Sequence, residues 1–88
     1  MNNIKEISKI IYELKSQKDI YNFLLEILTK SEVETLSKRW RILKGLSLGQ
    51  TQREISKDLK VSLCKVTRGS RLLKDKDSII TKYFNKEI

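Results

Sequence analysis

Residues 51–74, TQREISKDLKVSLCKVTRGSRLLK, carry the pattern of two short helices joined by a tight turn. Thr51 followed three residues later by Glu54 predicts a capping box, in which each side chain bonds the backbone N–H of the other residue. Ser62 is placed to cap the second helix. The stretch therefore predicts a helix-turn-helix.

Apolar residues within this stretch recur at helical spacing and should hold the two helices together crosswise. Ile55 and Leu59 form an apolar pair four residues apart on the first helix, and Val61 is expected in the turn. On the second helix, Leu63, Val66 and Gly69 are expected to face inward.

The side chains left outward include several cations, on a helix face of a kind that fits the major groove of DNA. This outward set is Arg53, Cys64, Lys65, Thr67, Arg68, Arg71 and Lys74. The residues expected to contact DNA are Gln52, Arg53, Ser56, Leu63, Cys64, Lys65, Thr67 and Lys74. The alternative is a helical hairpin whose polar face is merely solvated.

Charge is concentrated in the middle of the chain. The net charge of +8 divides into 0 for residues 1–29, +3 for 30–50, +5 for 51–76 and 0 for 77–88. A local surplus of cations suits a polyanion, because each phosphate contact releases condensed counterions. This distribution favours a nucleic-acid partner.

Composition narrows the function classes. With 88 residues, 39% hydrophobic and 34% charged, one soluble globular domain is expected. There is no long apolar run, no signal-peptide pattern and one cysteine, so a reducing cytoplasm is expected. Without histidine, neither a zinc site nor a histidine-activated nucleophile is expected. The sequence predicts neither an enzyme nor a metal or other cofactor.

Two apolar segments precede this region. Asn3 with Glu6 is expected to cap a first helix that is apolar on one face. After Asp19, a second helix is apolar on nearly every side, at Ile20, Tyr21, Phe23, Leu24, Leu25, Ile27 and Leu28. A surface helix of a monomer would not have this pattern. We expect a two-fold homodimer, with the alternative that both helices cover the domain's own core.

A long helix should begin at a second capping box, Thr29 with Glu32, and end before Gly49. Its expected core face is Val33, Leu36, Trp40, Leu43 and Leu46. Asp77 is expected to cap a last helix whose inward residues are Ile79, Ile80, Tyr83 and Phe84.

The prediction is an all-α single domain, residues 1–88, with six helices. Residues 1–50 form the dimerisation helices, 51–74 the helix-turn-helix, and 77–88 a C-terminal helix that packs on the dimer core.

The chain resembles the tryptophan repressor family over almost its full length. The most specific matches are LLEILT at 24–29, KRWRI at 38–42, TQRE at 51–54 and TRGS at 67–70. The resemblance implies an intertwined helical homodimer that binds a palindromic operator when L-tryptophan occupies a pocket. This pocket lies beside the second helix of the helix-turn-helix, the recognition helix, which contains TRGS. The same resemblance implies control of genes for tryptophan biosynthesis or uptake.

The resemblance also implies an effector site. Arg39 and Arg68 match the arginines that sandwich the indole, and Arg68 also meets the carboxylate. Gly69 matches the glycine that lets the ring approach the helix backbone. Backbone carbonyls of the partner chain are implied at Glu26, Leu28 and Thr29, and the Thr29 hydroxyl is expected mainly to cap a helix.

Departures from the family concern the effector more than the fold. Leu72 stands where a hydroxyl is usual near the effector's ammonium group, Lys65 replaces a small hydroxyl residue, and Glu26 replaces an apolar one. Lys60 occupies a turn position where glycine is usual. The effector is accordingly L-tryptophan or a related indole compound.

Other classes of function stay open on the sequence. The helix-turn-helix could bind DNA or another protein without an effector. A constitutive nucleoid-binding protein would bind DNA without effector and without sequence preference. The set of Arg39, Arg68 and Gly69 favours the effector-gated repressor.

Overall fold

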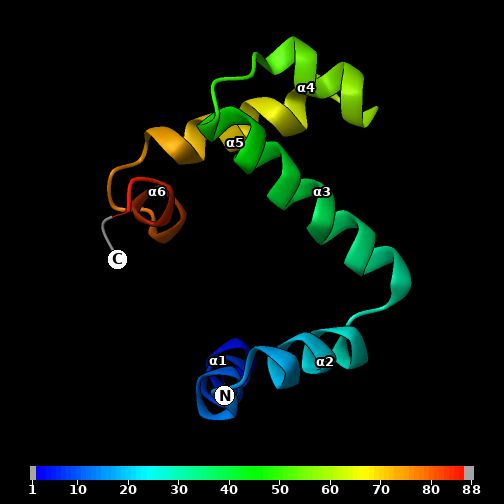
Figure 1. Ribbon diagram of the computed structural model, residues 1–88, viewed down its shortest axis with the longest axis vertical. Helices are drawn as coiled ribbons and strands as arrows, with labels where there is room; N and C mark the ends of the chain where they lie inside the picture. The colour runs from blue at the N-terminus through cyan, green and yellow to red at the C-terminus, as the bar shows by residue number, and fades with distance from the viewer. Residues whose placement is uncertain (1, 87–88) are drawn as a thin grey trace. The chain divides into compact units, whose positions relative to one another are not determined.

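The computed structural model describes residues 2–86, which form six helices and no strand. The helices are α1 (Asn3–Leu14), α2 (Gln17–Ile27), α3 (Lys30–Ser47), α4 (Gln52–Leu59), α5 (Leu63–Lys74) and α6 (Ile79–Phe84), in the order that Figure 1 shows. The predicted six-helix, all-α fold is confirmed. The last two residues of the predicted C-terminal helix, 87 and 88, lie outside the described residues.

The chain divides into two compact units. Unit 1 is Met1–Glu34 and holds α1, α2 and the start of α3, whereas unit 2 is Thr35–Ile88 and holds the rest. By sequence, unit 1 has a net charge of −1 and unit 2 of +9. The whole cationic surplus therefore belongs to the unit that contains the helix-turn-helix.

Both predicted capping boxes are present. Thr51 Oγ1 accepts the Glu54 N–H at 3.2 Å, and Glu54 Oε1 accepts the Thr51 N–H at 3.0 Å. Thr29 and Glu32 make the same pair of bonds, at 3.1 and 2.8 Å. The backbone hydrogen bond lowers the pKa of each glutamate below its ordinary 4.5, because it stabilises the carboxylate.

Three other helix starts differ from the prediction by one to three residues. Asn2, not Asn3, caps α1, and Ser16 caps α2 three residues before Asp19. Ser78, not Asp77, caps α6 by accepting the Thr81 N–H at 3.3 Å. The backbone N–H of Asp77 bonds Asp75 Oδ1 instead. In each case a neighbouring hydroxyl or amide oxygen satisfies the orphan N–H groups.

The core of unit 2 lies where α3, α4 and α5 meet. Ile42 of α3, Ile55 of α4 and Val66 of α5 are buried together, with Leu46, Leu59 and Val61 packed against them. Leu43, as predicted, is also buried. The predicted core positions Leu36 and Trp40 are wrong, since both are exposed, Trp40 to 43%. The residue missed was Ile42, two positions after Trp40.

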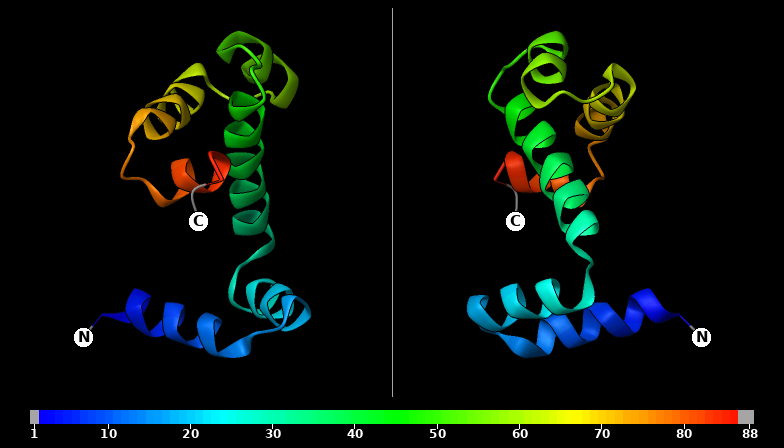
Figure 2. Two further views of the ribbon diagram at one scale, coloured as in Figure 1. Left: turned by 60° about the vertical axis from the view of Figure 1, so that its left-hand side comes forward. Right: turned by 90° about the vertical axis from the view of Figure 1, so that its right-hand side faces the viewer.

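Trp40 belongs to an aromatic cluster instead. Its ring stacks on Phe84 with centroids 5.1 Å apart and meets Tyr83 at 5.7 Å. These contacts set α6 beside α3, as both views in Figure 2 show. The predicted inward placement on α6 is wrong for Ile79, which is exposed. Tyr83 is 53% exposed although its ring meets Trp40, and the residue of α6 that is buried is Thr81.

Candidate nucleic-acid interface and effector site

The turn between α4 and α5 is closed by a side chain. Ser56 Oγ donates to the Val61 carbonyl at 2.6 Å, and the Val61 N–H donates back to the Ser56 carbonyl at 3.2 Å. Lys60 takes the left-handed conformation, φ 54°, at the C-cap of α4. Since the hydroxyl hydrogen of Ser56 is used in the turn, only its lone pairs are left for the predicted DNA contact.

Two glycines let α3 approach its neighbours closely. A Cβ on Gly69 of α5 would lie 3.1 Å from Cγ2 of Ile42, and a Cβ on Gly45 would lie 3.1 Å from Cδ1 of Ile55. Contacts this short are tighter than most real Cβ contacts, so the neighbouring isoleucine would have to shift by a few tenths of an ångström to admit a methyl group. The missing side chain of Gly69 therefore allows the close approach of α5 to α3 that the structure shows.

The outward cations predicted for the helix-turn-helix are all exposed. Arg53 stands on α4, Lys65 near the start of α5, and Lys74 at its end. Cys64 is exposed as well. Leu63, predicted both to face inward and to contact DNA, is 47% exposed, so its inward placement is wrong. Leu63 is the first residue of α5, and the buried residue of this helix, Val66, comes three positions later.

A hydrogen bond that the sequence did not predict joins the two helices. Thr67 Oγ1 of α5 donates to Gln52 Oε1 of α4 at 2.9 Å. The same hydroxyl lies 3.0 Å from the Leu63 carbonyl oxygen. Both side chains are half-buried. No periodicity signals a bond between residues 15 positions apart, so it could be found only once the helices were placed.

The effector residues predicted within unit 2 lie on α3 and α5, close in sequence to the contact between Ile42 and Gly69. Arg68 directly precedes Gly69, and Arg39 stands three residues before Ile42 and so on the same side of α3. Both arginines are exposed. Leu72, one turn further along α5, is half-buried, and its carbonyl oxygen accepts the buried Thr81 hydroxyl at 2.8 Å.

The three effector residues predicted in unit 1 lie at the end of α2 and in the link from α2 to α3. The Thr29 hydroxyl accepts the Glu32 N–H, and the Thr29 carbonyl accepts the Val33 N–H at 2.9 Å. The predicted capping role of its hydroxyl is confirmed. Glu26 and Leu28 stand at the C-terminal end of α2, where a helix leaves its last carbonyls without intrahelical partners. Their backbone oxygens suit an ammonium group better than that of Thr29.

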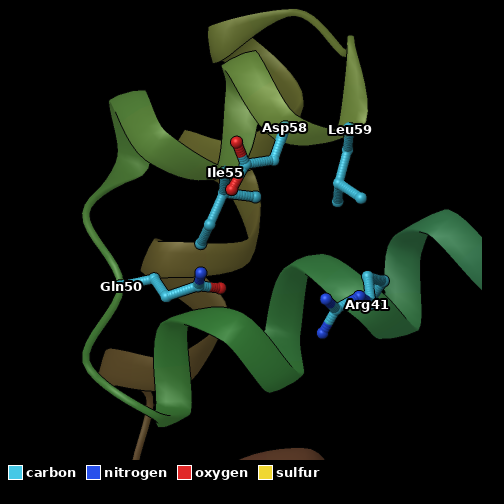
Figure 3. A pocket seen from close by; sticks show the side chains of 5 residues that line it. All are labelled: Arg41, Gln50, Ile55, Asp58 and Leu59. Atoms are coloured by element: carbon cyan, nitrogen blue, oxygen red, sulfur yellow. The ribbon is translucent and has the colours of Figure 1, made fainter.

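A small cavity between α3 and α4 does not offer an alternative effector site. Arg41, Gln50, Ile55, Asp58 and Leu59 line it, as Figure 3 shows, and its volume is about 10 Å³. This is room for about one water molecule and far too little for an indole ring. Among residues 2–86 no group of three or more histidine, cysteine or acidic side chains could hold a metal ion. Nor is any helix there long and apolar enough to cross a membrane.

Comparison with known proteins gives one consistent family. The Trp repressor protein family matches residues 2–88. A Trp operon repressor homolog of Xylella fastidiosa (strain M23) is 41% identical over 68 residues, covering 76% of this chain and 74% of the relative. One of Chlamydia trachomatis serovar D is 32% identical over 77 residues, covering 86% and 82%. No solved structure matches the chain.

Proposed function

The chain belongs to the Trp repressor family, a family of DNA-binding transcriptional regulators and not of enzymes, and from this premise we propose that L-tryptophan or a related indole gates its binding. The homodimer binds a palindromic operator when an effector fills the site beside α5. It acts in the cytoplasm on genes for tryptophan biosynthesis or uptake.

The observation that carries this proposal is the setting of Arg39 and Arg68. Arg68 directly precedes Gly69 on α5, Arg39 stands three residues before Ile42 on α3, and both arginines are exposed. Planar cations can hold an aromatic ring between them, and a guanidinium can also bind the carboxylate of an amino acid. The carbonyls of Glu26 and Leu28 of the second chain accept from the ammonium group.

Unit 1 supports the dimer. Neither α1 nor α2 has a buried residue, although both are rich in large apolar side chains. Ile4, Ile10, Tyr12, Tyr21, Leu25 and Ile27 are exposed. A second chain that covers these residues supplies the burial that they lack. It also places two recognition helices at half-sites about 34–36 Å apart.

Gating follows from differential binding. An effector between α5 and the dimer core shifts only the equilibrium between orientations of α5 that it binds differently. Operator affinity should therefore rise with L-tryptophan, and Arg39→Ala or Arg68→Ala should abolish that rise while the dimer stays folded. Lys44→Ala, which removes another exposed cation of α3, is the matched control. Equal affinity with and without every indole compound tried would refute the gating.

The identity of the effector depends on Leu72. A leucine offers no hydrogen bond to an ammonium group, and loss of a bond to a charged group costs about 1.5–3 kcal/mol. Lys65, one turn before Arg68, adds positive charge that favours the carboxylate. L-tryptophan should thus have only a small advantage over indole-3-propionate. Calorimetric titration with both should show Leu72→Ser restoring preference for tryptophan. If it gains nothing, Leu72 does not lie near the ammonium group.

The DNA contacts should separate into two kinds. Lys74→Ala removes a phosphate contact, weakens all sequences alike and reduces the slope of log K against log salt by about 1. Arg53→Ala removes a contact that reads sequence, costs about 1–3 kcal/mol and changes the preferred operator. Binding of a duplex library at several salt concentrations distinguishes them, and identical behaviour of both variants would contradict the assignment.

A further inference from the structure

We propose that Thr67 is a positioning residue, which holds the Gln52 carboxamide so that its NH2 group faces DNA as a hydrogen-bond donor to an acceptor on the operator. This inference rests on the proposed DNA-binding function and concerns how the same surface reads DNA. It changes the expected role of Thr67, because its hydroxyl then acts through Gln52 and not on DNA directly.

The geometry around the hydroxyl carries the proposal. Thr67 Oγ1 lies 2.9 Å from Gln52 Oε1 and 3.0 Å from the Leu63 carbonyl oxygen. The hydroxyl has one hydrogen to give to these two acceptors. When it goes to Gln52, the amide oxygen is held toward α5 and the amide nitrogen faces the opposite way.

The opposite arrangement of the amide is possible in the isolated protein. The Thr67 hydrogen then goes to the Leu63 carbonyl, the amide turns over, and its NH2 group donates to Thr67 Oγ1. Gln52 would in that case present an oxygen outward. Both arrangements satisfy the hydroxyl, so the partner outside the protein decides which one is populated.

Operator DNA favours the outward donor. Gln52 is the first residue of α4, where the partial positive charge of the helix end and the exposed cation of Arg53 attract a polyanion. Phosphate oxygens accept hydrogen bonds only, and so do N7 of the purines, O6 of guanine and O4 of thymine in the major groove. Only N6 of adenine and N4 of cytosine donate in the major groove, so an outward amide oxygen would find a partner at fewer positions than an outward NH2 group.

The first test measures the bond in the protein alone. The thermal unfolding midpoints of wild type, Gln52→Ala, Thr67→Val and the double variant should not be additive, because either substitution removes the same bond. Thr67→Ser keeps the hydroxyl and should restore most of the midpoint. Additive shifts would show that the two side chains do not interact, and would overturn the proposal.

The second test uses the duplex that wild type selects from a randomised palindromic library with L-tryptophan present. Thr67→Val and Gln52→Ala should each weaken binding by about 2- to 10-fold, the range of one neutral hydrogen bond. The double variant should bind the duplex with the same affinity as Gln52→Ala. Thr67→Ser keeps the hydroxyl, so its affinity should stay within about twofold of wild type. Ser70→Ala, which removes another hydroxyl of α5, is the matched control.

Gln52→Glu sharpens the test. Thr67 can still donate to one carboxylate oxygen, so the other oxygen faces DNA as an acceptor with negative charge. This variant should bind more weakly than Gln52→Ala. A Thr67→Val effect that persists unchanged in the Gln52→Ala background would mean that Thr67 contacts DNA itself, and no effect of Thr67→Val would remove its role. Either result overturns the proposal.

Two kinds of acceptor are distinguished by the same variants. If Gln52→Ala relaxes preference at one base pair in each half-site, the acceptor is a base edge. If it weakens all duplexes alike, and one methylphosphonate in the duplex removes the effect, the acceptor is a phosphate oxygen. Both results support the donor role. Failure of wild type to select any duplex refutes the proposed function and the donor role, whereas additive binding effects on a selected duplex refute the donor role alone.

Discussion

The two units of this chain differ in burial as much as in charge. Unit 2 is cationic and buries Ile42, Ile55 and Val66 between its helices, whereas no residue of α1 or α2 is buried. Unit 2 therefore holds a small core of its own. Unit 1 has the apolar side chains of a core without the burial, and in the proposed homodimer a second chain supplies the covering surface.

The largest effect should come from a charge placed in unit 1. Phe23→Lys puts an ammonium group among apolar side chains of α2 that we expect to be covered in the dimer, where an unpaired charge is costly. The variant should dissociate or unfold, while Asn22→Lys, at a polar position of the same helix, should not. Sedimentation measures both. A stable 10.4 kDa wild-type monomer at micromolar concentration would refute the dimer.

A matched pair of cavity-forming variants compares the two units directly. Ile55 is 2% exposed, so Ile55→Ala should lower the free energy of unfolding by about 2–5 kcal/mol. Leu25 is 46% exposed in the single chain. Leu25→Ala should lower the free energy of unfolding by a similar amount if the second chain covers this residue, but by only about 0.5 kcal/mol if it lies on the surface. Chemical denaturation at two protein concentrations measures both. A negligible cost for Leu25→Ala would mean that α2 is not at the interface.

Gly69→Ala tests the close approach within unit 2. The added methyl would lie 3.1 Å from Cγ2 of Ile42, and such overpacking costs about 1–3 kcal/mol. Replacing a helical glycine with alanine regains about 1 kcal/mol. We therefore expect a net loss of about 1 kcal/mol in denaturation, with unit 1 unaffected. A gain in stability would show that α5 can move away from α3 without penalty.

Two lysines that cap the C-terminal ends of helices in the left-handed conformation give a smaller effect, one in each unit. Lys15 ends α1 and Lys60 ends α4, both with φ 54°. Glycine relieves the steric cost of this conformation, about 1–2 kcal/mol, but adds freedom to the unfolded chain. Because these two effects oppose each other, Lys60→Gly should raise the free energy of unfolding by less than about 1 kcal/mol. Lys15→Gly should do the same only if unit 1 unfolds together with unit 2.

The smallest effect concerns the capping boxes, which occur in both units. The folded-state pKa of Glu32 and of Glu54 lies below the ordinary 4.5, so each contributes stability above that pH. The contribution is lost as the pH falls through the folded-state pKa. The thermal unfolding midpoint should decrease between neutral and acidic pH. This decrease should be smaller for Glu32→Gln and Glu54→Gln than for wild type. Unchanged pH dependence in either variant would mean that its cap adds nothing.

Local features of the sequence determined the number of helices and several of their ends. Thr51 with Glu54, Thr29 with Glu32, Ser62 and Gly49 act on backbone groups within a few residues, so their roles follow from order along the chain. The helix starts predicted wrongly, at α1, α2 and α6, are those where another polar residue competes within a few positions to cap the helix.

Tertiary structure decided which faces are buried and which side chains meet. Trp40 and Leu36 have the spacing of a core face, yet Ile42 is the residue that α4 and α5 cover, because burial depends on where distant helices cross. The bond from Thr67 to Gln52 and the contact of Gly69 with Ile42 have the same origin. Periodicity specifies that a helix has an apolar side, whereas packing against other helices selects the part of that side that is excluded from water.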